Sequence, residues 1–261
     1  MAVVRKKVGV AVVDGGMENN SHLNLKVERV WDFRGPEPMS CFGTDDSHAM
    51  EVAYTVLRAA SDQTVDLWSL RAQTLEEILR AIRWGITNHS PKSETEPIQV
   101  YCIPQVTKTA ATEHDRLLRD SIDMAIEEGV IICISLGNAP PFSAPATTGR
   151  AIRVGGFDKK ENGDLLVYPL PPPEGTPQPG AICKPDVLAP WAGYPLWNGK
   201  EGKAGTSIAA GHAAGRIARL LYDNPGWKHS HVMEHLKTKS HLEDSFGAMP
   251  SRDGSGYLVI D

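Results

Sequence analysis

Short apolar runs alternate with amphipathic segments along this chain, and that alternation constrains its fold more than any other feature. Val8–Val13 contains only valine, alanine and glycine, which is typical of a strand buried on both faces of a parallel sheet. Further strands are predicted at residues 65–70, 98–103, 130–136, 151–156 and 254–260. Helices, in which apolar residues recur about every 3.6 positions, are predicted at residues 49–60, 75–87, 116–128, 206–223 and 230–237. This order predicts an α/β fold: a three-layer, doubly wound, mostly parallel sheet with helices on both faces.

Two polar segments separate these predicted elements. Residues 17–44 are polar and irregular, so neither a strand nor a helix is predicted there. Residues 169–180 contain six prolines and predict a polyproline-like surface loop, which is either a rigid connector or a recognition segment. Because no internal repeat or boundary divides the sequence, residues 1–261 are interpreted as a single domain.

The composition argues against two classes of partner. The chain has 27 basic and 32 acidic residues, a net charge of −5, and therefore no basic excess to neutralise nucleic-acid phosphates. No apolar run reaches the roughly 20 residues that a membrane-spanning helix needs, so no membrane contact is expected. Four widely spaced cysteines, at positions 41, 102, 133 and 183, favour buried, reduced thiols and a cytoplasmic or intracellular protein. Two disulfides remain possible in number, although no spacing favours them.

Several polar residues stand where predicted strands end or helices begin. Asp14 follows the first strand, Asn138 follows the strand at 130–136, and His48 opens the helix at 49–60. In open parallel sheets the carboxyl ends of the strands meet at one edge, and ligands bind there. Gly15 and Gly16 lack the GxGxxG spacing of a dinucleotide-binding loop. A simple Asp-Gly turn remains the alternative to a functional role for Asp14.

Ser207 lies in a segment of different character, residues 203–215, where glycine and two hydroxyl residues precede a run of small residues. The segment predicts the start of a tightly packed helix. The N–H groups and the positive dipole at a helix N-terminus stabilise an oxygen that becomes negatively charged during a reaction. The simpler interpretation is a Ser or Thr side chain that caps the helix. Both interpretations stay open from this segment alone.

Histidines at positions 229, 231, 235 and 241 cluster late in the chain. His231 and His235 have helical spacing, but no Glu base or acidic ligand completes an HExxH pattern. A solvated helix face is therefore favoured over a metal site. No metal or cofactor is predicted for this chain.

The order Asp14, His48, Ser207 is that of the catalytic residues in subtilisin-type proteases. The surrounding sequence resembles motifs of the subtilases, the subtilisin-like serine proteases, over about residues 7 to 260. The matching segments are Val10–Gly16 at the aspartate, Asp45–His48 at the histidine, Ser135–Asn138 at the oxyanion asparagine, Lys184–Pro190, and Gly205–Ala210 at the nucleophile. The resemblance implies a subtilisin-like fold and a serine endopeptidase that acts on polypeptides without a cofactor.

The resemblance also implies a role for each residue. Ser207 would attack the scissile carbonyl, His48 would accept and return the proton, and Asp14 would orient the imidazole. The Asn138 amide and the Ser207 backbone N–H would bind the oxyanion. Substrate contacts are expected from Ser135, Leu136, Gly137 and Thr206.

Three positions depart from the subtilase pattern. Met50 replaces a threonine beside the catalytic histidine, Gly15 replaces a hydroxyl residue beside Asp14, and Pro104 falls where a Ser-x-Gly segment pairs with substrate. Since Pro104 has no N–H for such pairing, an alternative is a catalytically weak interaction or regulatory module of a larger multidomain protein. Because the first motif begins by residue 8, no propeptide is expected within this sequence. An intracellular form, or one domain of a longer parent chain, is therefore expected.

Overall fold

The computed structural model of this chain describes residues 6–17, 27–40, 47–92, 97–105, 113–138, 150–159, 161, 165–168, 185–195, 202–239 and 258–259. Its strands are β1 (Val8–Asp14), β2 (Val27–Asp32), β3 (Met39–Ser40), β4 (Val65–Arg71), β5 (Ile98–Ile103), β6 (Ile131–Ser135), β7 (Ile152–Lys159), β8 (Leu165–Tyr168), β9 (Val187–Pro190) and β10 (Leu258–Val259). Its helices are α1 (Ser47–Ala60), α2 (Leu75–His89), α3 (Glu113–Glu127), α4 (Thr206–Asp223) and α5 (His229–Lys239).

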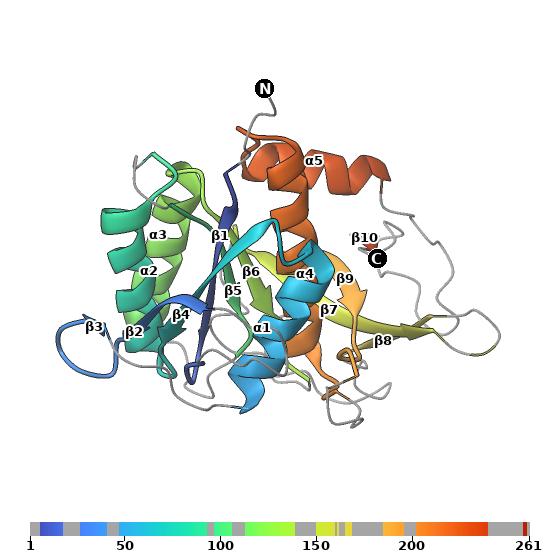
Figure 1. Cartoon of the computed structure of the whole chain (residues 1–261), viewed down its shortest axis with the longest axis horizontal. Coiled ribbons are helices and arrows are strands. Elements are labelled where there is room, and N and C mark those ends of the chain that lie inside the picture. Colours follow the sequence, from blue (N-terminus) through green and yellow to red (C-terminus); the bar gives the residue numbers. More distant parts are fainter. Residues whose placement is uncertain are drawn as a thin grey trace.

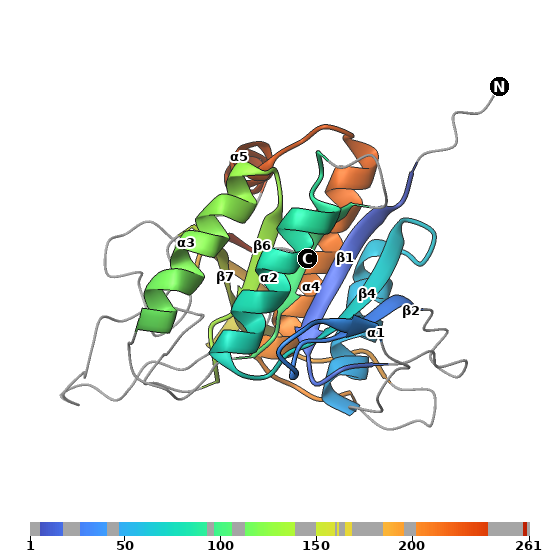
Figure 2. The same ribbon diagram turned by 90° about the vertical axis from the view of Figure 1, so that its left-hand side faces the viewer.

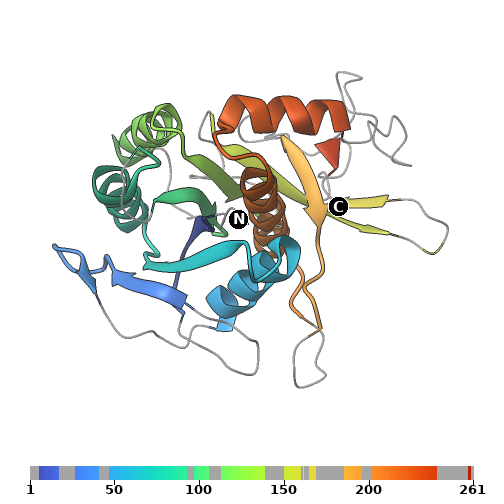
Figure 3. The same cartoon turned by 45° about the horizontal axis from the view of Figure 1, so that its top comes forward.

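These strands form one sheet in the order β10-β9-β7-β6-β5-β1-β4-β2-β3, with β8 paired to β7 (Figure 1). The pairs β2–β3 and β7–β8 are antiparallel, and the other pairs of the described strands are parallel. Helices cover both faces (Figure 3). The predicted three-layer, mostly parallel α/β fold is therefore confirmed.

The alternating side chains of β1 divide the core into two halves. Val8, Val10 and Val12 point into a core half rich in alanine and valine, to which α1, α4 and α5 contribute. Ala11 and Val13 point into the other half, where α2 and α3 contribute bulkier side chains (Figure 2). Because side chains alternate along a strand, Asp14 continues the first set. The carboxylate of Asp14 thus points toward the layer that holds α1 and α4.

The segment at 17–44 was expected to be irregular, and this expectation is wrong for part of it. Strand β2 pairs in parallel with β4, and β3 folds back against β2. The sequence Val-Glu-Arg-Val-Trp-Asp of β2 has no continuous apolar run, because the strand lies near the sheet edge and several of its side chains reach solvent. Only Leu258 and Val259 of the predicted last strand, and none of the proline-rich loop at 169–180, lie within the described residues.

Two of the four cysteines lie within the described residues. Cys102 on β5 and Cys133 on β6 are register partners, and both are buried and free. Burial raises the pKa of the Cys133 thiol to about 12, so this thiol stays protonated and unreactive. Cys41 and Cys183 fall outside the described residues. None of the helices in the described ranges combines the length and the apolar character that a bilayer crossing requires.

Candidate active site

The predicted site residues gather at the carboxyl edge of the sheet. Asp14 ends β1 and Ser135 ends β6, while α1 and α4 begin at this same edge (Figure 1). His48 is the second residue of α1, and Ser207 is the second residue of α4. The fold therefore brings residues from distant parts of the sequence to one place.

Asp14 and His48 are in direct contact. The Asp14 Oδ2 atom lies 2.6 Å from Nδ1 of His48, and Oδ1 accepts a hydrogen bond of 2.8 Å from the Gly15 N–H. The main chain thus supplies a donor to the carboxylate at the position where the expected hydroxyl is missing. Asp14 is buried, whereas the His48 side chain is 35% exposed. A proton held on Nδ1 by the carboxylate leaves Nε2 as the basic nitrogen of the ring.

Met50 does not prevent this contact. Its partly buried side chain packs against the core half under α1 and α4. The Asp14–His48 distance of 2.6 Å is short even for a charge-assisted N–H···O hydrogen bond, for which about 2.7–2.9 Å is usual.

Thr206 organises the residues around Asn138. The Thr206 hydroxyl donates to Asn138 Oδ1 over 2.9 Å, accepts from the Gly137 N–H over 3.1 Å and lies 2.8 Å from the Ser135 hydroxyl. The Thr206 N–H donates to the same Asn138 oxygen over 2.9 Å. With its oxygen occupied in this way, the Asn138 side chain leaves its Nδ2 group without an acceptor among the described residues.

Ser207 does not cap helix α4. The N-cap is Gly205, which makes no side-chain capping bond, so the interpretation of Ser207 or Thr206 as a helix cap is wrong. The N–H groups of Ile208 and Ala209 donate to the Gly205 carbonyl. The Ser207 N–H has no acceptor within the part of the chain that the structure describes.

The missing side chain at Gly205 leaves room around these donors. A Cβ atom at this position would lie 3.3 Å from both Ser207 Oγ and Asn138 Nδ2. The hydroxyl and the amide therefore border the same small space. Within the described ranges, the N–H donors of Ser207 and Asn138 have no acceptor, and both lie beside the hydroxyl of Ser207.

The packing of α1 against α4 sets the relative level of His48 and Ser207. A Cβ atom on Gly211 would meet the Val52 carbonyl oxygen at 3.0 Å, and one on Gly215 would meet that of Val56 at 2.5 Å. A step of four residues along α4 thus matches a step of four along α1, so the two helices run parallel. One turn earlier, the same register brings Ser207 to the level of His48.

An ion pair adds a second contact with α1, from the residues just before α4. The Lys203 N–H donates to Glu51 Oε2 over 2.9 Å, and its ammonium group lies 3.4 Å from Glu51 Oε1 and 3.0 Å from the Ser47 hydroxyl. Ser207 therefore lies between two residues that contact α1, Lys203 before it and Gly211 after it. Sequence reasoning missed Lys203 and Glu51, although their opposite charges stand close to Ser207 and His48.

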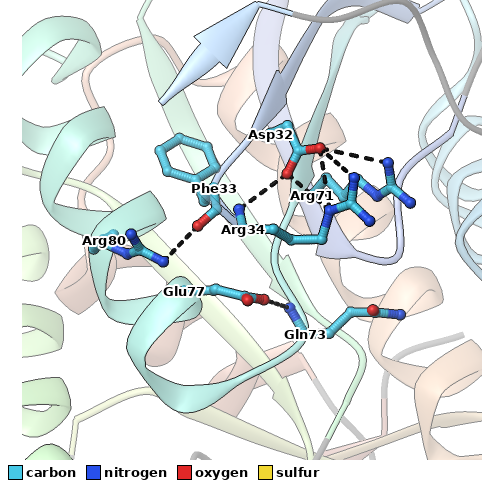
Figure 4. A network of polar contacts seen from close by, with 7 residues as sticks. All are labelled: Asp32, Phe33, Arg34, Arg71, Gln73, Glu77 and Arg80. Carbon is cyan, nitrogen blue, oxygen red and sulfur yellow. Dashed lines mark hydrogen bonds and ion pairs between the residues drawn. The ribbon is translucent and has the colours of Figure 1, made fainter. Parts of the chain in front are cut away.

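A second polar network braces the neighbouring strands (Figure 4). Asp32 accepts hydrogen bonds from the Arg34 side chain at 2.7 to 3.1 Å and from Arg71 at 3.4 Å. Bonding to Arg34 lowers the pKa of the Asp32 carboxyl below its usual value. Arg80 binds the carbonyls of Phe33 and Gly35. Arg71 is the register partner of both Asp14 and Asp32, and its guanidinium group binds Asp32.

Among the expected substrate contacts, Leu136 is fully buried in the core half under α2 and α3. It can therefore contact a substrate only through its main chain. Pro104 is buried after β5, and residues 106–112, which would include most of a substrate-pairing segment, lie outside the described residues.

The histidine cluster is split between burial and exposure. His231 is exposed, and His229 and His235 are partly buried on α5. Trp227 lies 6.4 Å from the His231 ring and 5.3 Å from the His235 ring, measured between centroids. His241 lies outside the described residues, among which no group of three or more metal-ligating side chains occurs.

Comparison with known proteins gives one consistent result. The model of the subtilase family matches residues 5–256. The chain belongs to the subtilase family. Among curated subtilases it is 24% identical to alkaline elastase YaB of Bacillus sp. (strain YaB), over 88% of this chain and 58% of the relative. Its identity to subtilisin E of Bacillus subtilis (strain 168) is also 24%, over 92% and 62% of the two chains.

Solved structures agree on the subtilase fold. The S41 psychrophilic protease superposes with a TM-score of 0.73 at 22% identity, covering 97% of this chain and 91% of that one. Sphericase superposes with a TM-score of 0.70 at 19% identity, covering 99% and 95%. The chain spans 58% and 62% of the length of the two curated relatives.

Proposed function

We propose that this subtilase is a serine endopeptidase that hydrolyses peptide bonds of polypeptide substrates. The observation that carries the proposal is the 2.6 Å contact between Asp14 and His48. Ser207 begins the neighbouring helix at the same level as His48, beside two N–H donors that have no acceptor in the described part of the chain. Membership of the subtilase family supports the same conclusion.

In the proposed reaction, His48 Nε2 accepts the proton of the Ser207 hydroxyl while Oγ attacks the carbonyl carbon of the scissile bond. Asp14 keeps the ring in the required tautomer and stabilises the imidazolium. The imidazolium then donates its proton to the leaving amine, and water releases the acyl group by the reverse sequence.

Asn138 Nδ2 and the Ser207 N–H are proposed to bind the oxyanion of the tetrahedral intermediate. Both groups are donors, and both border the space beside Gly205. Loss of a side-chain donor of this kind costs roughly 2.7–4 kcal/mol in a subtilisin. Thr206 is proposed to orient the Asn138 amide, because its N–H and hydroxyl bind the carbonyl oxygen of that side chain. Ser135 supports it through contacts with the Thr206 hydroxyl and the Gly137 N–H.

Labelling with a fluorophosphonate probe tests this function. The native protein should be labelled at Ser207, and Ser207→Ala should abolish labelling and lower peptidase activity by about 10⁶-fold, the size found for a subtilisin nucleophile. Ser230→Ala is a matched control, because Ser230 is also the second residue of a helix and is exposed. This variant should be labelled like the native protein.

A well-folded native protein that resists labelling would contradict the proposal. That result would instead favour the catalytically weak interaction module. Labelling that persists in Ser207→Ala would show that another residue reacts with the probe.

A further inference from the structure

We propose that Gln105 is a positioning residue for the catalytic aspartate, holding the end of β1 so that Asp14 faces His48. The inference rests on the proposed function. It concerns the segment directly after β5, where the sequence departs from the subtilase pattern. The structure gives this segment a contact with the strand that carries Asp14.

The Gln105 side chain bridges two carbonyl groups. Its Nε2 atom donates to the Val13 oxygen over 3.1 Å and to the Ala72 oxygen over 2.5 Å. Both partners are acceptors, so only the NH₂ end of the amide can occupy this position. Both N–H groups of the side chain are therefore used. Because β1 lies between β5 and β4 in the sheet, the bridge reaches across β1 and joins three strands.

These bonds fix the backbone on both sides of Asp14. The Val13 carbonyl, which belongs to the peptide unit before Asp14, is held by Gln105. The Asp14 carbonyl, in the peptide unit after it, accepts the Ala72 N–H over 2.9 Å. Two fixed peptide units determine the direction of the Asp14 Cα–Cβ bond. The Gly15 N–H and His48 then need to fix only the side-chain rotation.

The other end of the bridge is anchored. Ala72 lies between Arg71, which binds Asp32, and Gln73, whose N–H donates to Glu77 over 2.7 Å (Figure 4). Glu77 also completes a capping box at the start of α2, which holds this turn in place. Gln105 thus ties the end of β1 to a turn that is itself held by side-chain hydrogen bonds.

The opposite end of the same strands offers a matched control. The Thr64 hydroxyl also interacts with two carbonyls, those of Ala60 and Ser61, at 2.9 and 2.8 Å. The Thr64 carbonyl accepts the N–H of Val8, at the start of β1. Thr64→Val therefore removes a comparable bridge at the amino edge of the sheet, far from Asp14.

The test compares Gln105→Met, which keeps the side-chain length but has no N–H, with Thr64→Val and the native chain. One readout is the rate constant of fluorophosphonate labelling. The other is the deshielded proton resonance of the His48 Nδ1–H, measured in the Ser207→Ala background so that it needs no activity. We expect Gln105→Met to lower the labelling rate about 10- to 100-fold and to shift or broaden the resonance. Thr64→Val should alter neither.

Each outcome decides the inference. Unchanged labelling and an unchanged resonance in Gln105→Met would overturn it and leave the proposed function standing. If the native protein is not labelled, the proposed function fails, but the resonance still shows whether Gln105 positions Asp14. If Gln105→Met does not fold, Gln105→Asn takes its place, since that amide is one methylene too short to reach both carbonyls.

Discussion

The two helical layers of this subtilase use glycine in different ways. In the layer of α1 and α4, Gly211 and Gly215 face main-chain atoms, the carbonyl oxygens of Val52 and Val56. In the layer of α2 and α3, Gly85 faces the hydroxyl end of the Tyr101 side chain, which projects from β5. A main-chain contact cannot move without moving the helix, whereas a side chain can rotate or be shortened.

This difference follows the location of the site. His48 and Ser207 both begin helices of the first layer, and the close backbone contacts fix the level at which they meet. None of the predicted catalytic residues comes from α2 or α3. We infer that the glycine contacts of the first layer fix the position of α4 along the axis of α1. The second layer only has to fill the core with bulky side chains.

Gly215→Ala should have the largest effect. The added Cβ would lie 2.5 Å from the Val56 carbonyl oxygen and 2.8 Å from the Ala59 Cβ, so α4 must move relative to α1. We expect a loss of about 1–3 kcal/mol in the free energy of unfolding and a fall of about 100-fold in kcat/KM, because Ser207 is displaced from His48. Urea unfolding and peptide hydrolysis measure the two quantities.

Gly85→Ala is the matched change in the other layer. It should also destabilise the protein, because the new methyl group collides with Tyr101. Its kcat/KM should stay within about twofold of the native value, since the register of α1 and α4 is untouched. Equal losses of kcat/KM in both variants would show that the layers do not differ in this respect.

His212 should make the first layer sensitive to acid. This residue of α4 is buried, with Nε2 3.3 Å from the Ala192 carbonyl oxygen, and burial lowers its pKa to about 4. Between pH 6.5 and 4 the unfolded chain binds a proton that the folded chain does not, so stability falls as the pH falls. The expected loss from this residue is up to about 3 kcal/mol.

Urea unfolding at pH 7 and pH 4 measures that loss. Burial also lowers the pKa of His229, and carboxyl groups contribute to the total, so the comparison is made with His212→Gln. The variant should be less stable than the native protein at pH 7, and it should lose less stability on acidification. The same pH dependence in both proteins would exclude His212 as the cause.

Thr206→Val should have a smaller effect, confined to the start of α4. The change leaves the buried Gly137 N–H without its Thr206 acceptor and removes one of the two bonds to Asn138 Oδ1. We expect a loss of about 1–2 kcal/mol in stability and a fall of about tenfold in the fluorophosphonate labelling rate. Thr206→Ser, which keeps the oxygen, should restore most of the rate. If the valine variant is labelled at the native rate, the hydroxyl does not aim Asn138.

Sequence reasoning predicted the elements whose signals are local. The apolar run at Val8–Val13 and the helical period of α1 and α4 predicted the central elements, and the motif order predicted that Asp14, His48 and Ser207 belong to one site. Strand β2 was missed because its stability depends on pairing with β4, which its own polar sequence does not reveal. The hydrogen bonds of Gln105 and Lys203 join residues far apart in the chain, so no local sequence pattern predicts them. The single-domain organisation and the intracellular setting stay predictions.

The smallest expected effect belongs to the second layer, at the atom that Gly85 accommodates. The Tyr101 hydroxyl is fully buried without a hydrogen-bond partner among the described residues, and burial raises its pKa. Tyr101→Phe removes this unsatisfied group, so we expect the free energy of unfolding to rise by about 1 kcal/mol with no change in the labelling rate. The same substitution should also reduce the cost of Gly85→Ala, because it removes the hydroxyl oxygen that would lie 1.6 Å from the new Cβ and leaves only the milder contact with Cζ at 2.9 Å. No comparable relief exists for Gly215, whose neighbour is a main-chain carbonyl. A double-mutant cycle on Gly85 and Tyr101 measures the interaction free energy between the two substitutions. If this free energy is zero, contacts other than the one with Tyr101 set the cost of Gly85→Ala.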